Sequence, residues 1–308
     1  MFDAMHSLLR PMLYISLVAA IGLFGCAPVP DQAGAAESGV EAQPLAQPMP
    51  PIYETVRLHA ATVHVVTIPD PVNYPLRVAV VDLLARVDAI AAQVCEGDGC
   101  VAAAINAGFF DPSNGLTTSH VVKDGVLVAD PSQNERLVGN PDLASYMDRI
   151  LNRSEFRRYD CDSTPSYDIT FHSAPVPAGC DLVDAVGAGP QLLPQDTSVE
   201  EGFVDSAAGR DALGSQSANA RSAVGLTADG CVVLVMAAQV PGVSPSGMTM
   251  AEVAEVMRDR GVVKALNLDG GSSSTLLYGD TIHYGRLNAS GELVQRPVKS
   301  ILWVENTP

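Results

Sequence analysis

The segment from Val262 to Leu277, which reads VVKALNLDGGSSSTLL, restricts the possible folds more than any other part of the chain. Its first seven residues form a largely apolar run that is typical of a buried strand. The rest contains a carboxylate, two glycines and four consecutive hydroxyl residues, which would be costly to bury without partners. We therefore expect a rigid strand that ends at a polar site, where Asn267 and Asp269 meet a ligand and the glycines let the backbone approach it.

The pattern on either side of this segment predicts a sheet-rich domain. A helix should begin at Thr249 and end at Gly261, because Thr249 and Glu252 have the spacing of a capping box and apolar residues recur on one face. Further strands are predicted over 56–68, 76–83 and 298–304, and in the apolar run 101–110, where the strand ends at the carboxamide of Asn106. Hairpin turns are predicted at 123–125, 228–230 and 278–280, and a helix over 143–159. We predict an α+β fold in a single domain, with a mixed, mostly antiparallel sheet, hairpins and a few packed helices.

The charge of the chain excludes one class of partner. The 308 residues carry a formal net charge of −17, with only three lysines. Such a surface repels the phosphate backbone of nucleic acids, so we expect no nucleic-acid partner. The hydrophobic fraction of 47% is enough for a sizeable core.

The N-terminus has the features of an export signal. Arg10 precedes an apolar run over 12–24 that is too short for a comfortable membrane span. The run ends at Cys26 in a sequence that resembles a bacterial lipobox, which would attach the protein to a membrane through a lipid. The alternative is an ordinary signal peptide cut a few residues later. We predict a signal peptide over 1–25, a disordered tether rich in proline and alanine over 26–52, and a catalytic domain over 53–308.

The cysteines fit an oxidising compartment such as the cell envelope. Cys95 and Cys100 flank a tight acidic loop, and Cys161 and Cys180 bracket a segment that contains proline, so we expect two local disulfides. Cys231, inside an apolar strand, is predicted to be a buried thiol. No CxxC pair occurs, so a structural zinc site of that type is not expected.

Four shorter motifs are ambiguous when each is taken alone. The residues INAGFFD at 105–111 and VGAGPQLL at 186–193 can be explained as a strand end and a Gly-Pro turn. Arg221 and Arg296 each stand at the start of a predicted strand, where either can hold an anion or form a surface ion pair. In combination with the 262–277 segment, however, these motifs follow one another in a specific order.

This order resembles the phosphodiester glycosidase domain family. The matching blocks are INAGFFD at 105–111, VGAGPQLL at 186–193, RSAVGLTADG at 221–230, GMTMAEVAEVM at 247–257, ALNLDGGSSSTLL at 265–277 and RPVKSILWV at 296–304. The resemblance as a whole covers roughly residues 53–304. The chain departs from the family at Ser272 and Ala107, where glycine is common, and in the stretch after Met236, which lacks the Asp-Gly pair common there. These departures bear on the identity of the substrate.

The resemblance implies hydrolysis of a sugar 1-phosphodiester, of the N-acetylglucosamine type, without a cofactor. Asp269 would face the positive charge that develops on the sugar, as nucleophile, base or stabiliser, while Arg221 or Arg296 holds the phosphate. The other expected site residues are Asn106 and Asn267 for sugar hydroxyls, His120 as a proton donor, and Gly189, Gly270, Gly271, Ser273 and Ser274 as substrate-binding groups.

Three alternatives remain open at this stage. The same scaffold can support a different hydrolase or lyase that acts on an envelope polysaccharide, or a non-catalytic glycan-binding lipoprotein. A divalent cation can be held by oxygen atoms of Asn106, Asp111 and Asp269. A serine hydrolase is not expected, because Gly271–Ser274 lacks the GxSxG pattern of a nucleophile elbow.

Overall fold

The computed structural model describes residues 47–58, 60–94 and 99–306 and confirms the α+β class. The first of three large sheets contains, in spatial order, β1 (Ile52–Leu58), β2 (Ala61–Ile68), β14 (Val232–Gln239), β13 (Arg221–Thr227), β15 (Val262–Asn267) and β10 (Gln191–Leu193). The second contains β17 (Thr281–Tyr284), β16 (Thr275–Tyr278), β4 (Val101–Asn106), β18 (Val298–Glu305) and β3 (Leu76–Ala85). The strand pairs within each sheet are antiparallel.

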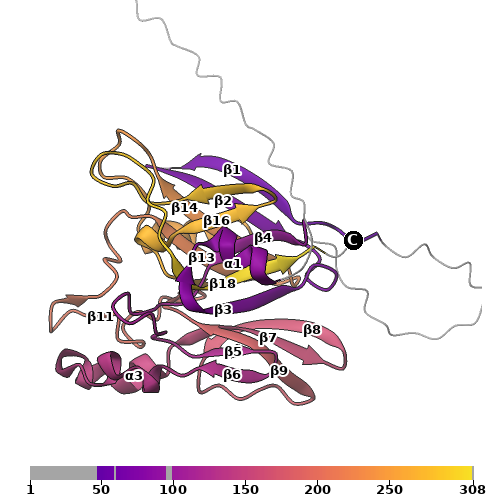
Figure 1. Ribbon diagram of the computed structural model, residues 1–308, viewed down its shortest axis with the longest axis horizontal. Coiled ribbons are helices and arrows are strands. Elements are labelled where there is room, and N and C mark those ends of the chain that lie inside the picture. The colour runs from indigo at the N-terminus through magenta and orange to yellow at the C-terminus, as the bar shows by residue number, and fades with distance from the viewer. Residues whose placement is uncertain (1–46, 59, 95–98, 307–308) are drawn as a thin grey trace, which may run out of the picture.

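The third sheet lies below the other two in Figure 1. Its order is β6 (Val126–Ala129), β5 (Val121–Lys123), β9 (Cys180–Gly187), β7 (Ser154–Cys161) and β8 (Thr164–Phe171). A short ribbon of β11 (Val204–Asp205) and β12 (Arg210–Asp211) stands apart from the three sheets. The remaining elements are the helices α1 (Val87–Val94), α2 (Glu135–Val138), α3 (Met147–Leu151) and α4 (Met250–Arg258), and the 3₁₀ turns at Pro131–Gln133, Pro141–Tyr146 and Gly271–Ser273.

One hydrophobic core joins all three sheets. It contains Leu234 of the first sheet, Ile105 of the second and Phe156 of the third, all completely buried. Helix α4 covers the outer face of the first sheet, and α1 packs against the outer face of the second. Because the three sheets share this central core, the strand ends between them are held in fixed positions.

The turn and capping predictions are confirmed. Asp124 and Gly125 have φ values of 50° and 77° between β5 and β6, the positive region that Asp-Gly turns favour. Gly230 lies between β13 and β14 with a φ of 89°. At the start of α4, Thr249 and Glu252 form both hydrogen bonds of the capping box.

Two sequence-based elements are wrong in their extent. The strand predicted over 56–68 is two strands, since Leu58 of β1 pairs with Ala61 of β2 across a reversal of the chain. The helix predicted over 143–159 ends at Leu151, and β7 begins at Ser154. In β7 the side chains of Glu155 and Arg157 lie on one face and form a buried ion pair. Residues two positions apart share a face in a strand but not in a helix, so this pair requires the strand.

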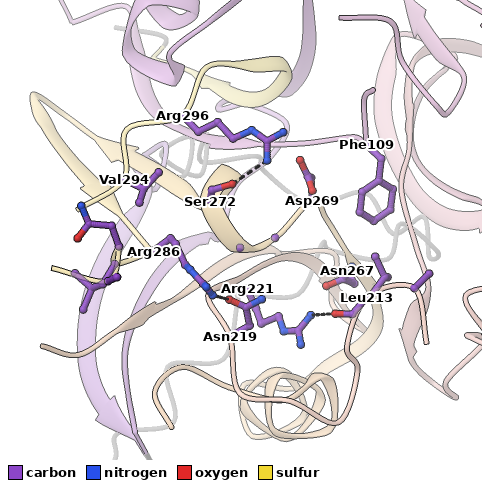
Figure 2. A pocket seen from close by; sticks show the side chains of 16 residues that line it. Phe109, Leu213, Asn219, Arg221, Asn267, Asp269, Ser272, Arg286, Val294 and Arg296 are labelled. Carbon is purple, nitrogen blue, oxygen red and sulfur yellow. Dashed lines mark hydrogen bonds between the residues drawn. The ribbon is translucent and has the colours of Figure 1, made fainter. Parts of the chain in front are cut away.

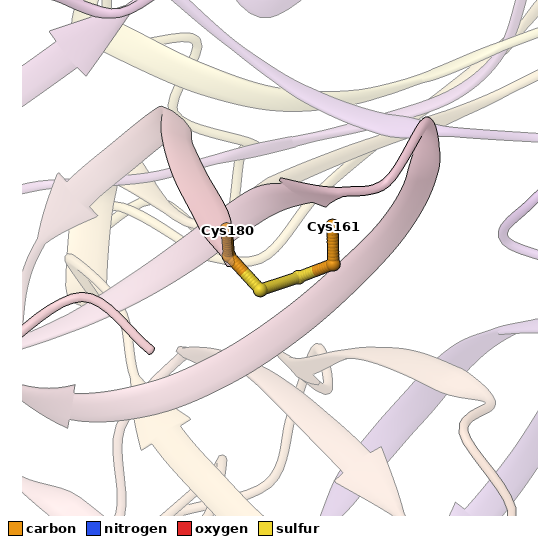
Figure 3. The surroundings of a disulfide bond; sticks show 2 residues. All are labelled: Cys161 and Cys180. Atoms are coloured by element: carbon orange, nitrogen blue, oxygen red, sulfur yellow. A yellow bond between two sulfur atoms is a disulfide. The ribbon is translucent and has the colours of Figure 1, made fainter. Parts of the chain in front are cut away.

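The cysteine predictions have mixed outcomes. Cys161 and Cys180 form the expected disulfide, which joins paired positions of the neighbouring strands β7 and β9 (Figure 3). Cys231 is disulfide-bonded, as is Cys100, so the prediction of a buried thiol is wrong. Burial alone does not decide the redox state of a cysteine, since a partner from elsewhere in the chain can reach it. Cys95 lies outside the described residues.

The export signal, Cys26 and most of the tether also lie outside the described residues, so these assignments stay predictions. Among the helices of the described part of the chain, none is both long and apolar enough to cross a membrane.

Candidate active site

A cavity of about 540 Å³ opens where the ends of β4, β13 and β15 meet. Its wall is built by Phe109 after β4, by residues 212–221 at the start of β13, by residues 267–272 at the end of β15, and by residues 286–296 between β17 and β18. Figure 2 shows the carboxylate of Asp269 near Phe109 and the guanidinium of Arg296. The volume suits a ligand the size of a sugar phosphate.

Asn106 fixes the loop that carries Asp269. Its side-chain amide donates to the backbone carbonyl of Asp269, and its oxygen accepts from the Ser222 hydroxyl at 2.8 Å and from the Thr275 N–H at 3.0 Å. The side chain is completely buried and does not line the cavity. Asn106 therefore clamps three strand ends together, and its placement does not favour the predicted contact with a sugar hydroxyl.

Asp269 is the one carboxylate among the described residues that line the cavity. Desolvation raises its pKa to about 6, although a hydrogen bond to Ser273, the positive charge of Arg296 and the Gly270 N–H lower it in part. Its backbone N–H donates to the carbonyl of Ala107 at 2.8 Å. A carboxylate held this way can carry a proton or a negative charge close to neutral pH.

Arg221 lines the cavity but is committed to the protein itself. Its guanidinium donates to the backbone carbonyls of Leu213, Gly214, Ser217 and Met248, at 2.6–3.1 Å. The residue is only 3% exposed. Four of its five N–H groups are thus used to close the loop before β13, which makes it a poor candidate for the phosphate-binding arginine.

Arg286 and Arg296 each donate fewer hydrogen bonds to the protein than Arg221 does. One nitrogen of Arg296 donates to the Ser272 hydroxyl at 2.8 Å, and one of Arg286 donates to the Asn219 side-chain oxygen (Figure 2). Within the described part of the chain, neither forms a salt bridge. Two arginines that form no salt bridge in the described structure, in a chain of net charge −17, provide the cavity with donors for an anion.

The remaining predicted residues divide into those at the cavity and those behind it. Asn267, Gly270 and Gly271 line it. Ser273 and Ser274 are completely buried behind the loop and do not line the cavity, and the Ser273 hydroxyl interacts with the Asp269 carboxylate from there. They therefore support the loop from behind and do not face the cavity.

Gly189 supports the site from outside the lining. Its N–H and carbonyl bond the backbone carbonyl and side-chain amide of Asn267, both at 2.9 Å. With a φ of 112°, it has no space for a side chain, because an added Cβ would lie 2.2 Å from the Glu201 carboxylate. The glycine is therefore required by packing, and its contact is with Asn267.

His120 does not line the cavity. It stands just before β5, and its ring stacks on that of His172. The oxygen atoms proposed for a divalent cation are also engaged elsewhere: Asp111 pairs with Arg136 at 2.7 Å, and the Asn106 oxygen accepts two hydrogen bonds. The arrangement thus gives no support to a cation held by Asn106, Asp111 and Asp269.

Sequence reasoning missed Arg286, Asn219 and Ser272, which are part of the cavity wall. Phe109 was ambiguous, since an aromatic residue after a strand is often core. The one available signal for Arg286 was a lone arginine in a polar segment between two predicted strands. That signal is weak, because its position opposite Asn219 depends on how the loop between β17 and β18 folds back.

Comparison with known proteins places this geometry in context. The sequence profile of the phosphodiester glycosidase family matches residues 99–305. No curated protein sequence matches the chain at a significant level.

Solved structures share the fold at low sequence identity. The catalytic domain of zebrafish N-acetylglucosamine-1-phosphodiester alpha-N-acetylglucosaminidase, auto-inhibited by its pro-peptide, has a TM-score of 0.58 and 19% identity over 88% of this chain and 87% of that one. A hypothetical protein from Synechocystis has a TM-score of 0.52 and 19% identity over 82% and 61% of the two chains. A protein of Burkholderia pseudomallei K96243 thought to be exported has a TM-score of 0.55 and 16% identity over 80% and 74%. Because the family profile covers most of the folded residues, the chain belongs to the phosphodiester glycosidase family.

Proposed function

We propose that this protein hydrolyses a sugar 1-phosphodiester and releases the free sugar and a phosphate monoester. One observation carries the proposal: the same cavity is lined by a single carboxylate, Asp269, and by Arg286 and Arg296, neither of which forms a salt bridge among the described residues. A phosphodiester supplies a negative charge for the arginines, and its sugar supplies the centre that Asp269 would stabilise. The zebrafish enzyme of similar fold is named for a substrate of this class.

The chemistry follows from where charge develops. Cleavage of the bond between the anomeric carbon and the phosphate oxygen makes the sugar positive and the departing phosphate negative. Ionised Asp269 stabilises the first charge, as nucleophile, as base for a water molecule or by its field, and Arg286 and Arg296 stabilise the second. Phosphate is a good leaving group, so the reaction does not require a strong general acid, and the position of His120 outside the lining is consistent with this.

We also propose that the protein is exported to the cell envelope and anchored through a lipid on Cys26. The Cys161–Cys180 disulfide supports export, because such bonds persist in oxidising compartments. The lipobox-like sequence before Cys26 supports the anchor.

The first experiment is turnover of a panel of sugar 1-phosphodiesters, N-acetylglucosamine among them, by the parent chain and by Asp269→Asn. We expect the rate of sugar release to be lower by about a hundredfold or more for Asp269→Asn than for the parent, since the neutral amide cannot stabilise the positive charge. Asp280→Asn, on an exposed turn, is the matched control. Sugar release that is equal in parent and Asp269→Asn, or absent for every substrate with folded protein, would overturn the proposal.

The pH dependence provides a second readout. Because the pKa of Asp269 is about 6 in the free protein, kcat/KM should rise with pH and level off above that value if the ionised form is required. A rate that instead falls as pH rises through 6 would mean that Asp269 acts as an acid.

A further inference from the structure

A second cluster of ionisable side chains lies in the third sheet, outside the lining of the cavity. His120 precedes β5, Glu155 lies on β7 and His172 follows β8. One possible ligand atom from each of the three residues lies within 4.8 Å of the other two. We propose that these residues form a binding site for a first-row transition metal ion, with Zn²⁺ as the expected occupant.

The donor set fits such an ion. Zn²⁺ binds imidazole nitrogen and carboxylate oxygen at roughly 2.0–2.2 Å, commonly with three protein ligands and water. Asp130 adds a further carboxylate, since its oxygen lies 3.6 Å from Nε2 of His120. The cluster thus contains two imidazoles and two carboxylates, which are donor types that a divalent transition metal ion binds.

The surroundings orient the ligands as outer-shell groups orient those of known metal sites. Glu155 is 2% exposed at its side chain, and its Oε2 accepts from Nε of Arg157 at 2.8 Å. Its other oxygen, Oε1, is directed at Nδ1 of His172 at 2.5 Å. Arg157 also donates to the backbone carbonyl of His172 at 2.6 Å. One arginine thus holds both Glu155 and the segment that carries His172, which pre-organises the pair.

The rings of His120 and His172 lie face to face beside the Glu155 carboxylate. They stack with centroids 3.6 Å apart and planes inclined by 4°. Both imidazoles are therefore held next to the carboxylate, and imidazole nitrogen is a common ligand of Zn²⁺.

Binding requires a small rearrangement. Parallel rings cannot both direct their in-plane lone pairs at one ion, so one must turn out of the stack. The side chain of His172 is 38% exposed and that of His120 is 13% exposed, so His172 is the ring that can turn and admit an ion. The turn must bring the ligand atoms to about 3.3 Å from one another, the spacing around a tetrahedral zinc.

A comparison within the same chain shows what distinguishes this cluster. His64 and His283 also stack, with centroids 4.2 Å apart. Their nitrogens bond the Tyr53 hydroxyl at 2.7 Å and 3.0 Å instead of a carboxylate. That pair therefore offers two imidazoles and a neutral phenol, which is a poor donor set for a divalent ion, and it serves as an internal control.

The cluster also touches the support of the cavity. The backbone carbonyl of His120 accepts from the Gly187 N–H at 2.9 Å, and Gly187 leads through Ala188 to Gly189, which holds Asn267. An ion that joins the segments next to β5, β7 and β8 would stabilise this wall. Metal binding at this cluster does not depend on the proposed reaction.

The test is a titration of the whole chain, purified without a histidine tag, treated with EDTA and dialysed. We expect isothermal titration to show one saturable Zn²⁺ site, with affinity at least about tenfold weaker in His172→Ala and His120→Gln, because even the loss of an outer-shell partner costs that much. His283→Gln should bind like the parent. His172→Ala changes a partly exposed residue, so it should fold, which unfolding without added metal will check.

Two further readouts complete the test. Zn²⁺ should raise the unfolding temperature of the parent and of His283→Gln but not of His172→Ala. Co²⁺ in place of Zn²⁺ should give visible absorption without thiolate charge-transfer bands, since ligation is by nitrogen and oxygen. Absence of saturable binding in the parent, equal affinity in parent, His120→Gln and His172→Ala, or a thiolate spectrum would overturn the proposal.

Discussion

At the scale of single residues, charge and solvation separate the side chains that can act from those that hold the site together. Arg221 and Arg296 were equivalent in the sequence, as arginines before strands. In the structure Arg221 bonds four backbone carbonyls, whereas Arg296 bonds one hydroxyl and lies over the ring of Phe110 at 5.1 Å. The difference depends on how the chain folds around each guanidinium, since three of the carbonyls that Arg221 bonds belong to the loop just before it, whereas Ser272 and Phe110 are distant from Arg296 in sequence.

Replacement of each arginine by lysine should distinguish these roles. Arg296→Lys is expected to reduce kcat/KM roughly tenfold to a hundredfold with an unchanged free energy of unfolding, because a point charge replaces a planar donor. Arg221→Lys should instead lower the free energy of unfolding by about 2 kcal/mol or more, since most of its bonds to carbonyls are lost. Kinetics and urea unfolding measure both. Unchanged kinetics in Arg296→Lys would remove that residue from the mechanism.

The buried carboxylate of Asp269 should make stability depend on pH. Its pKa is about 6 in the folded protein and 3.8 for an ordinary solvated aspartate, so the folded state binds the proton more tightly. The resulting stabilisation is complete below pH 3.8 and is lost as pH rises through 6. Asp269→Asn lacks this loss and should be more stable than the parent by about 1–3 kcal/mol at pH 8, with a smaller difference near pH 4.5.

Urea unfolding of both proteins at the two pH values checks this expectation, with Asp280→Asn as the exposed control. A difference between parent and Asp269→Asn that does not change with pH would show that the carboxylate is not desolvated.

At the scale of elements, the site exists because strands of different sheets end at one place. β4 of the second sheet and β15 of the first are joined where Ala107 accepts from the Asp269 N–H and where Asn106 bonds the loop beyond it. Residues 262–268 predicted the strand and its polar end. They could not show that the partner was Asn106, because that contact is made across 163 positions of sequence.

Removal of the Asn106 clamp should therefore destabilise the fold as well as the site. Asn106→Ala leaves the Thr275 N–H, the Ser222 hydroxyl and the Asp269 carbonyl without their partner in a buried region. We expect the free energy of unfolding to fall by about 2–4 kcal/mol, whereas Gln133→Ala, at an exposed position, should change it by about 0.5 kcal/mol or less. Equal urea midpoints for the two variants would contradict the role of Asn106 as a clamp.

At the scale of the whole molecule, the shared core predicts cooperative unfolding. The three sheets pack their apolar faces on one cluster of buried residues, so loss of one sheet exposes the others. Trp303, the one tryptophan in the sequence, reports on the second sheet, where it is 6% exposed.

The fluorescence of Trp303 and the far-ultraviolet circular dichroism of all sheets should therefore change at the same urea concentration, with the disulfides kept oxidised. A fluorescence transition that is separate from the circular dichroism transition would show that the sheets unfold independently.

The sequence by itself determined the elements whose causes are local. Asp-Gly pairs set the hairpin turns, Thr249 and Glu252 began α4, and the apolar run after it formed β15, because these depend on neighbouring residues and on backbone sterics. The alternation in β7 was hidden by a pattern that also suited a helix, and its ion pair of Glu155 and Arg157 was decided by packing. Only the tertiary structure placed Arg286 at the cavity and brought His120 to His172, since each of these contacts joins segments far apart in the chain. It also decided the role of Arg221, because the loop just before this residue folds back so that its carbonyls meet the guanidinium.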